Sequence, residues 1–155
     1  MEINYFSGVI LTKSILKGMV ERGYGHIASV SSITGKFGFP LRSAYSASKH
    51  AMVGFYETVG TEYYDQGIRT TLVFPGRVNT SISLGALGPD GQPRNVMDPG
   101  QQYGISAERC AMDIINGIRK DKREVLSGSK ELIMVYVKRF LPGLAFRMAR
   151  KIKRI

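Results

Sequence analysis

The chain has 155 residues, of which 43% are hydrophobic and 22% charged, and its formal net charge at pH 7 is +10. This composition is sufficient for one packed domain, and no apolar run of about 18 residues predicts a membrane-spanning helix. The single cysteine, Cys110, excludes an internal disulfide framework, and the two histidines have no neighbours at the spacing of metal ligands. The sequence therefore predicts one domain and no metal site.

Helical and extended segments alternate along the chain. Apolar residues near the N-terminus recur at helical spacing as far as Gly23, and a short β-branched run follows. A second helical stripe ends at Gly67, where a buried apolar strand begins. The predicted elements are a helix over 2–22, a strand over 26–31, a helix over 43–65, a strand over 68–74, a helix over 107–118 and a strand over 123–126. This order predicts an α/β fold with a parallel sheet and right-handed crossovers, in which ligands bind at the carboxyl ends of the strands.

The longest predicted loop covers residues 76–105 and shows little periodicity. Loops of this length inside a compact domain are commonly lids or binding segments, and the Gly, Pro and polar content of this one is typical of a segment that moves over a pocket. We therefore predict a lid loop over 76–105. The alternative is a poorly ordered excursion with no role in binding.

Most of the positive charge lies near the C-terminus. Seven basic residues and no acidic ones follow Glu131, which leaves a net +3 for residues 1–131. On a helix over 144–155, five basic side chains share one side and the apolar ones share the other, which predicts an amphipathic tail that contacts an anionic membrane. The alternative is a terminal helix docked on its own domain with its basic face in solvent. Nucleic acid is not a predicted partner, because no recognised reading motif accompanies the charge.

Tyr45 and Lys49 are four residues apart, so both side chains project from one face of the predicted helix. A phenol with an ordinary pKa near 10 is a poor acid or base at neutral pH, but a nearby ammonium stabilises the phenolate and makes the group usable for proton transfer. Because such a pair also arises by chance, it predicts no function by itself.

Three further features of the sequence accompany this pair. Ser32 closes the first strand 13 residues before Tyr45, Asn4 lies 41 residues before it, and Pro75-Gly-Arg-Val-Asn-Thr80 follows the second strand. Taken singly, each has a structural explanation as a cap, a turn or a strand exit. Ser31 is a rival for the serine position, although the 13-residue spacing favours Ser32. Together the set resembles the short-chain dehydrogenase/reductase family over essentially the whole chain.

The resemblance implies a role for each member of a catalytic set. Tyr45 is the general acid/base that exchanges a proton with a substrate oxygen, and Ser32 hydrogen-bonds and polarises the same oxygen. Both therefore contact the substrate. Lys49 makes the tyrosine a stronger acid and hydrogen-bonds the nicotinamide ribose. Asn4 holds a water that links the lysine to solvent.

The segment after the second strand is implied to hold the nicotinamide end of a dinucleotide. The Val78 backbone and the Thr80 hydroxyl bind the carboxamide and orient the ring for hydride transfer, and Pro75 and Gly76 begin the segment. These residues, with the tyrosine and the lysine, make up the predicted cofactor site. The resemblance implies NADP or NAD as cofactor and slightly favours NADP.

The family has a glycine-rich phosphate loop, and a residue that selects NAD or NADP, before the position that matches Asn4, and neither is present in this sequence. The resemblance therefore implies only the C-terminal, catalytic half of a Rossmann-like, doubly wound α/β fold over residues 1–130, followed by a basic amphipathic tail over 131–155. Such a chain is expected to be inactive alone, whether it is a fragment, a truncated gene model or a short isoform.

Within the family, residues 42–51, Gly25-His-Ile27 and Leu141-Pro-Gly-Leu144 are similar to the member 7 and 7B branch. This similarity implies an oxidoreductase that interconverts a hydroxyl and a carbonyl on a small, hydrophobic substrate such as a lipid, steroid or retinoid. It also implies a membrane-associated location at the endoplasmic reticulum or peroxisome, with the cytoplasm as the alternative. The helices over 2–22 and 43–65 are implied to form a homo-oligomer interface. The alternative function is a non-catalytic module that binds a membrane surface or a protein partner.

Overall fold

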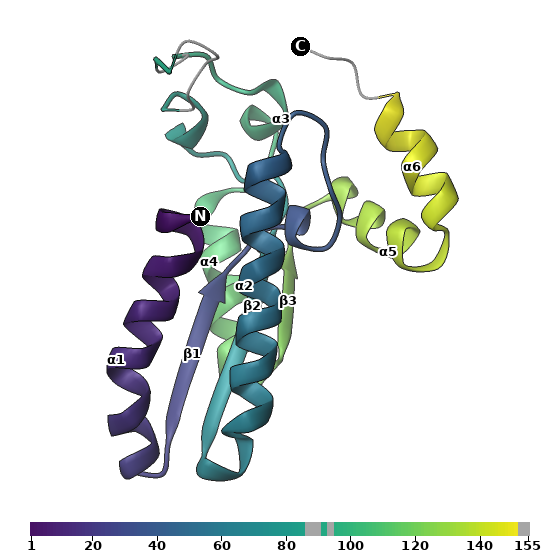
Figure 1. Cartoon of the computed structure of the whole chain (residues 1–155). Helices are drawn as coiled ribbons and strands as arrows, with labels where there is room; N and C mark the ends of the chain where they lie inside the picture. Colours follow the sequence, from purple (N-terminus) through teal and green to yellow (C-terminus); the bar gives the residue numbers. More distant parts are fainter. Residues whose placement is uncertain (86–90, 93–94, 152–155) are drawn as a thin grey trace.

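The computed structural model describes residues 1–85, 91–92 and 95–151, and its centre is a parallel sheet of three strands (Figure 1). Strands β1 (Gly25–Val30), β2 (Ile68–Pro75) and β3 (Glu124–Ser127) lie in that order across the sheet. β1 pairs with β2 over its whole length, and β2 pairs with β3 from Leu72 to Pro75. The predicted α/β fold with a parallel sheet is confirmed.

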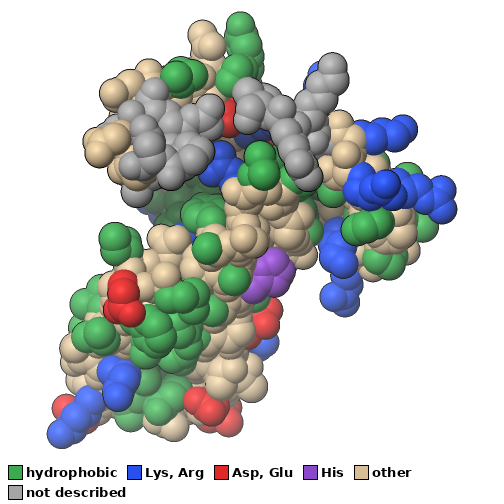
Figure 2. Space-filling view, turned by 45° about the horizontal axis from the view of Figure 1, so that its top comes forward, with side chains coloured by type: hydrophobic (Ala, Val, Ile, Leu, Met, Phe, Trp, Pro, Cys, Tyr) green, Lys and Arg blue, Asp and Glu red, His purple; other side chains and the backbone are tan. Residues whose placement is uncertain are grey.

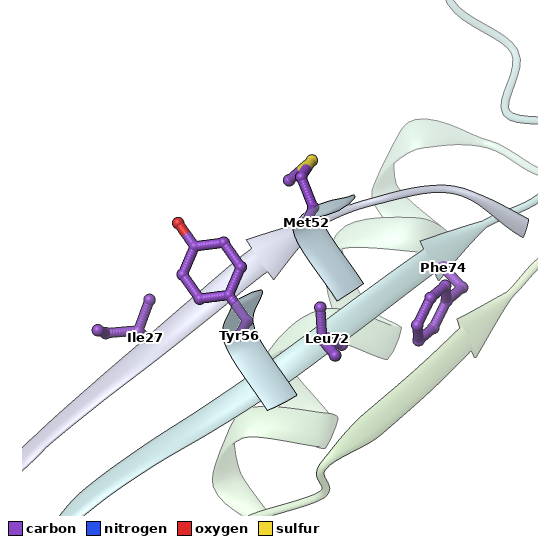
Figure 3. Close-up of a cluster of buried hydrophobic side chains, with 5 residues drawn as sticks. All are labelled: Ile27, Met52, Tyr56, Leu72 and Phe74. Atoms are coloured by element: carbon purple, nitrogen blue, oxygen red, sulfur yellow. The ribbon is translucent and has the colours of Figure 1, made fainter. Parts of the chain in front are cut away.

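Two long helices cover one face of the sheet. These are α1 (Ser7–Glu21) and α2 (Ser43–Glu62), whereas α4 (Ala107–Arg119) packs on the opposite face of β2 and β3. A buried apolar cluster joins α2 to the sheet (Figure 3). Its members are Ile27, Met52, Tyr56, Leu72 and Phe74. Side chains alternate across a strand, so the neighbouring Val73 and Val125 point to the other face, where Val125 approaches Gly117 of α4.

The two connections across the sheet differ in hand. Both step in the same direction, from β1 to β2 and from β2 to β3, yet α2 and α4 lie on opposite faces. A right-handed connection from β1 through α2 is therefore followed by a left-handed one through α4. The second connection contains the long loop 76–105, so its helix does not need to return directly over the same face.

Gly23 follows the end of α1, and Gly67 ends the 3₁₀ turn Tyr64–Gln66 that follows α2, both at positions that the sequence indicates. Gly23 and Gly67 have φ angles of 74° and 80°, in the left-handed region that side chains rarely adopt. Gly67 also lies so close to the backbone carbonyl of Gly23 that a Cβ there would overlap it. The chain therefore turns tightly from each helix into its strand.

Strand β1 is incompletely covered in the described part of the chain. Its side toward α2 is buried, but Ala28 and Val30 on the other side are exposed, with 49% of Val30 accessible to solvent. One edge of β1 also pairs with no strand among the described residues. An uncovered β-branched side chain beside a free strand edge is typical of a surface that another segment covers.

The basic tail forms two helices, which we name the α5–α6 hairpin. They are α5 (Ile133–Phe140) and α6 (Pro142–Arg150), which pack on each other, and Ala145 of α6 is buried. The single predicted helix over 144–155 is thus wrong at its start, and residues 152–155 lie outside the described part. No helix among the described residues is long and apolar enough to cross a membrane.

Candidate active site

The first two turns of α2 carry Tyr45 and Lys49 on one face, as their spacing predicts. The Lys49 Nζ atom lies 5.7 Å from the centre of the Tyr45 ring, and 37% of the tyrosine is exposed. Lys49 Nζ donates a hydrogen bond of 3.1 Å to the carbonyl of Val30, at the end of β1. Burial lowers the pKa of the Lys49 ammonium below its ordinary value of 10.5. The lysine is therefore held between the tyrosine and the sheet.

The two serines after β1 have different environments. Ser31 is buried, and its hydroxyl donates to the Lys49 carbonyl at 3.1 Å, which ties the strand end to α2. Ser32 is only half-buried, and its hydroxyl accepts the Thr34 N–H at 3.2 Å, at the start of a 3₁₀ turn. A hydroxyl that accepts one bond still has a proton to donate. Ser31 therefore has a structural contact, and the Ser32 hydroxyl keeps a proton that it can donate.

Asn4 lies in a π-helical turn, Glu2–Phe6, that precedes α1. Its side-chain amide donates to the Ser48 hydroxyl at 3.1 Å, and Ser48 in turn donates to the Tyr45 carbonyl at 2.7 Å. π-Helical turns are frequent at functional sites. The chain of bonds fixes Asn4 against the turn that carries the tyrosine, and Ser48 is a member of this arrangement that the sequence analysis missed.

The segment 75–80, which we call loop 75–80, leaves β2 next to the end of β1. The Ser31 N–H donates to the Val73 carbonyl at 2.8 Å, so the two strand ends are adjacent. Val78 forms an isolated parallel bridge with Ile105. Bonds on either side of this bridge, from Asn79 N–H at 2.9 Å and to the Arg77 carbonyl at 3.0 Å, join both ends of the predicted lid loop.

The Thr80 hydroxyl makes no capping hydrogen bond at the start of the turn Ser81–Ser83. It therefore has both donor and acceptor capacity for another group. Within 76–105, the structure also has a short helix, α3 (Pro99–Gln102), whose Asp98 cap accepts the Gly100 N–H at 2.7 Å. Residues 86–90 and 93–94 of the predicted lid lie outside the described residues.

Two surface hollows of about 580 and 420 Å³ lie away from these residues. The larger is lined by α2, β2 and β3 near Tyr64 and Arg69, and the smaller lies against α4 and α5. None of the predicted catalytic or cofactor residues lines either hollow. The candidate site is instead an open surface at the carboxyl ends of β1 and β2, beside the uncovered edge of β1.

A family model described as short chain dehydrogenase matches residues 1–86, which is more than half of the chain. The chain belongs to the short-chain dehydrogenase family. Dehydrogenase/reductase SDR family member 7B of Mus musculus is 42% identical over 149 residues, which cover 96% of this chain and 46% of the relative. SDR family protein 7-like of Drosophila melanogaster is 40% identical and covers 94% of this chain and 45% of the relative. The chain thus spans about half the length of the curated relatives that it matches.

Solved structures share the fold of this chain. A short chain dehydrogenase from Burkholderia cenocepacia in complex with NADP has a TM-score of 0.78 at 22% identity, and the match covers 99% of this chain and 58% of that one. A short chain dehydrogenase/reductase from Burkholderia phymatum in complex with NAD has a TM-score of 0.68 at 20% identity, over 86% and 53% of the two chains. The Rossmann-like fold class is therefore shown.

Proposed function

We propose that this chain carries the catalytic half of an NAD(P)-dependent oxidoreductase that interconverts a hydroxyl and a carbonyl. The observation that carries the proposal is the arrangement around the first two turns of α2. Tyr45 and Lys49 share a face there, Asn4 is bonded to the same turns through Ser48, and Ser32 follows a serine that is bonded to Lys49. Family membership supports the same reaction class.

Tyr45 is the proposed proton donor in the direction of reduction. Its hydroxyl gives a proton to the carbonyl oxygen of the substrate, and the Lys49 ammonium stabilises the phenolate that remains. The Ser32 hydroxyl donates to the same oxygen and orients the carbonyl. In the direction of oxidation, the tyrosinate accepts the proton of the alcohol. A bound nicotinamide dinucleotide supplies or accepts the hydride.

The residues present fit the nicotinamide end of such a cofactor. Lys49 uses one oxygen acceptor within the protein, the Val30 carbonyl, so its ammonium has further donors for ribose hydroxyls. The Thr80 hydroxyl, which makes no capping bond, is the proposed partner of the carboxamide, with the Val78 backbone beside it. Pro75 and Gly76 place this segment at the end of β2. The choice between NADP and NAD stays open, with NADP as our first expectation.

A small, hydrophobic substrate is proposed because apolar side chains are exposed on the described part of loop 76–105. Ile82 is 72% exposed and Val96 is 59% exposed, and Tyr103 near the end of the loop is 84% exposed. Side chains of this kind are costly to leave in water and are suited to contact a lipid-, steroid- or retinoid-like molecule. They support the interpretation of this loop as a lid over a substrate.

The direct test is transfer of a labelled hydride. The protein that carries this chain is supplied with NADPH or NADH deuterated at the nicotinamide C4 position and with a panel of hydrophobic ketones. We expect deuterium at the carbinol carbon of the product. Products without deuterium, with any of the ketones and either nucleotide, contradict the proposal.

We further propose that residues 1–155 alone do not turn over substrate. The exposed Val30 and the edge of β1, which pairs with no strand among the described residues, support this proposal, because a dinucleotide fold has further strands beside the crevice where the cofactor lies. The test compares this chain with the same chain preceded by a dinucleotide-binding segment of a member 7B relative. Equal turnover by both proteins would exclude the proposed inactivity.

The α5–α6 hairpin supports a second candidate function, contact with an anionic membrane surface. Phe140 and Phe146 are 73% and 66% exposed, and the hairpin carries five basic residues up to Lys151 and no acidic ones. Figure 2 shows Lys and Arg side chains projecting around this part of the molecule. Exposed aromatic and basic side chains on one short helical unit are typical of interfacial binding. A location at the endoplasmic reticulum or peroxisomal membrane stays a prediction.

Vesicle flotation tests the hairpin. We expect binding to phosphatidylcholine vesicles only when they contain phosphatidylserine, and about fivefold weaker binding for each of Arg147→Gln and Arg150→Gln. Lys120→Gln with Lys122→Gln is the matched control, because both residues are exposed on the body of the domain. Equal binding to neutral and anionic vesicles would contradict the electrostatic part of this proposal.

A homo-oligomer through α1 also stays a proposal. Apolar side chains of α1 and of the turn before it are exposed, with 88% of Ile3, 65% of Ile10 and 63% of Leu11 accessible. Exposed apolar side chains at helical spacing favour burial against a second copy. Sedimentation of wild type beside Ile10→Glu tests this, and a monomeric wild type at micromolar concentration contradicts it.

A further inference from the structure

Glu131 joins the loops that follow two neighbouring strands. It lies in the 3₁₀ turn Lys130–Leu132, between β3 and α5. Its Oε1 atom accepts the Arg77 N–H from loop 75–80 at 2.8 Å and the Ser129 N–H at 3.1 Å. One carboxylate oxygen therefore binds the backbone after β2 and the backbone after β3 at the same time.

The chain leaves space for this carboxylate. A Cβ at Gly76 would overlap the Glu131 carboxylate, and a Cβ at Gly128 would lie 2.7 Å from Oε1, closer than real Cβ contacts. Neither glycine has a positive φ, so space rather than backbone conformation is what each provides. A bond of 2.7 Å from the Gly76 N–H to the Ser127 carbonyl continues the strand pairing up to the carboxylate.

Glu131 is ionised at neutral pH. Its partial burial opposes ionisation, but the N–H donors of Arg77, Glu131 and Ser129 and the Arg77 guanidinium outweigh that effect, so the pKa of the Glu131 carboxyl is below its ordinary value of 4.5. Hydrogen bonds to a charged acceptor are about twice as strong as neutral ones. The contact is thus stronger than an ordinary loop bond.

We propose that the Glu131 carboxylate is a positioning group that holds loop 75–80 against the end of β3 and so connects the α5–α6 hairpin to that loop. The importance of the loop for catalysis rests on the proposed function, in which Val78 and Thr80 bind the nicotinamide carboxamide. Glu131 itself lies behind the loop and acts through the Arg77 amide. A shift of α5, whose first residue is Ile133, would move this carboxylate and with it the loop.

Amide hydrogen exchange of the 155-residue chain tests the contact directly. In Glu131→Ala, we expect the Arg77 and Ser129 amides to exchange about 10- to 100-fold faster, which is the loss of one hydrogen bond to a charged group. Glu131→Gln keeps a side-chain oxygen and should restore part of the protection. Glu57→Gln, an exposed carboxylate on α2, should leave both amides unchanged.

The core amide of Val73 serves as an internal reference, because a general loss of stability would raise its exchange as well. Unchanged exchange at Arg77 in Glu131→Ala would overturn the proposal. Equal acceleration at Arg77 and at Val73 would also overturn it, since Glu131 would then contribute to stability only.

Gly76→Ala provides a second test from the other side of the contact. The new methyl group has to displace the carboxylate, so Arg77 exchange should rise by a similar factor in this variant. In the double variant Gly76→Ala with Glu131→Ala, we expect no further rise, because the shortened side chain leaves room for the methyl group. Additive effects of the two substitutions would contradict the proposal.

A titration with NADPH and NADH separates this inference from the proposed function. In the protein that carries this chain, Glu131→Ala should raise KM for the nucleotide severalfold while kcat changes less. If the wild-type protein binds neither nucleotide, the proposed function fails, whereas the exchange measurements still decide the role of Glu131.

Discussion

The first two turns of α2 and the α5–α6 hairpin are held in place in different ways. Around α2, a hydrogen bond from the buried residue Ser31 and another from a partly buried lysine fix the helix against the sheet. In the hairpin, Ala145 is the buried residue, while Phe140 and Phe146 are largely exposed. Contacts within the protein thus hold the residues of the candidate active site in place, whereas the large apolar side chains of the hairpin face solvent. Matched substitutions in the two regions should separate these cases.

The largest expected difference in stability is between alanine substitutions of two phenylalanines, one in each region. Phe74 is fully buried beneath α2, so Phe74→Ala should lower the free energy of unfolding by about 3–5 kcal/mol. Phe146 on the hairpin is 66% exposed, and Phe146→Ala should change it by less than about 0.5 kcal/mol. Urea unfolding of both variants measures this. Equal losses would show that the hairpin is part of the core.

The next comparison adds one methyl group at a glycine in each of the two regions. At Gly35 a Cβ would lie 2.6 Å from Ser31 Oγ and 3.0 Å from the Lys49 carbonyl oxygen, so Gly35→Ala should destabilise by about 1–3 kcal/mol. At Gly143, in the first turn of α6, nothing lies within 4 Å, and Gly143→Ala should stabilise by about 0.4–1 kcal/mol. Thermal unfolding of the two variants shows whether each substitution lowers or raises stability. A stabilising Gly35→Ala would mean that the strand end is not packed on α2.

Substitution of Ser31 and of Ser32 should separate an effect on stability from an effect on turnover. Ser31→Ala removes the side-chain donor to the Lys49 carbonyl and should cost about 0.5–1.5 kcal/mol of unfolding free energy, with turnover largely kept. Ser32→Ala should cost less stability but lower kcat about 100-fold, because the substrate oxygen loses its donor. Turnover and unfolding are measured on the same preparations. A large loss of turnover in Ser31→Ala, but not in Ser32→Ala, would identify Ser31 as the functional serine.

The smallest expected effect is the pH dependence from Glu131, at the junction between the sheet and the hairpin. Because the folded-state pKa of this carboxyl is lowered, its contribution to stability is present above the ordinary value of 4.5 and is lost as pH falls below it. Glu131→Gln should therefore flatten the acid side of the stability profile. The Glu57→Gln control should keep the wild-type slope. An unchanged slope in Glu131→Gln would contradict the lowered pKa.

The sequence was informative where a contact depends on periodic spacing. The helix with Tyr45 and Lys49 on one face, the strands before and after it and the glycines that end the helices all follow from local patterns. Pro142 is informative in the same way, because proline is common in the first turn of a helix. It is the first residue of α6.

No local pattern in the sequence indicates which side chains bind a distant segment of the chain. Nothing in the residues near Glu131 indicates that it accepts the Arg77 amide 54 residues earlier, and nothing near Asn4 indicates that it donates to Ser48. The left-handed connection through α4 was missed for a related reason. It depends on how a long loop packs, which no short pattern records.

The central claim is that the first turn of α2 supplies the proton-transfer group, and Tyr45→Phe tests it most directly. The substitution removes one hydroxyl from a side chain that is 37% exposed, so the fold should be unaffected. The measurement is kcat/KM for nucleotide-dependent reduction in the protein that carries this chain, with Tyr24→Phe, 68% exposed beyond α1, as the matched control. We predict a loss of about 10²- to 10⁴-fold for Tyr45→Phe and none for the control. Undiminished turnover in Tyr45→Phe would contradict the account.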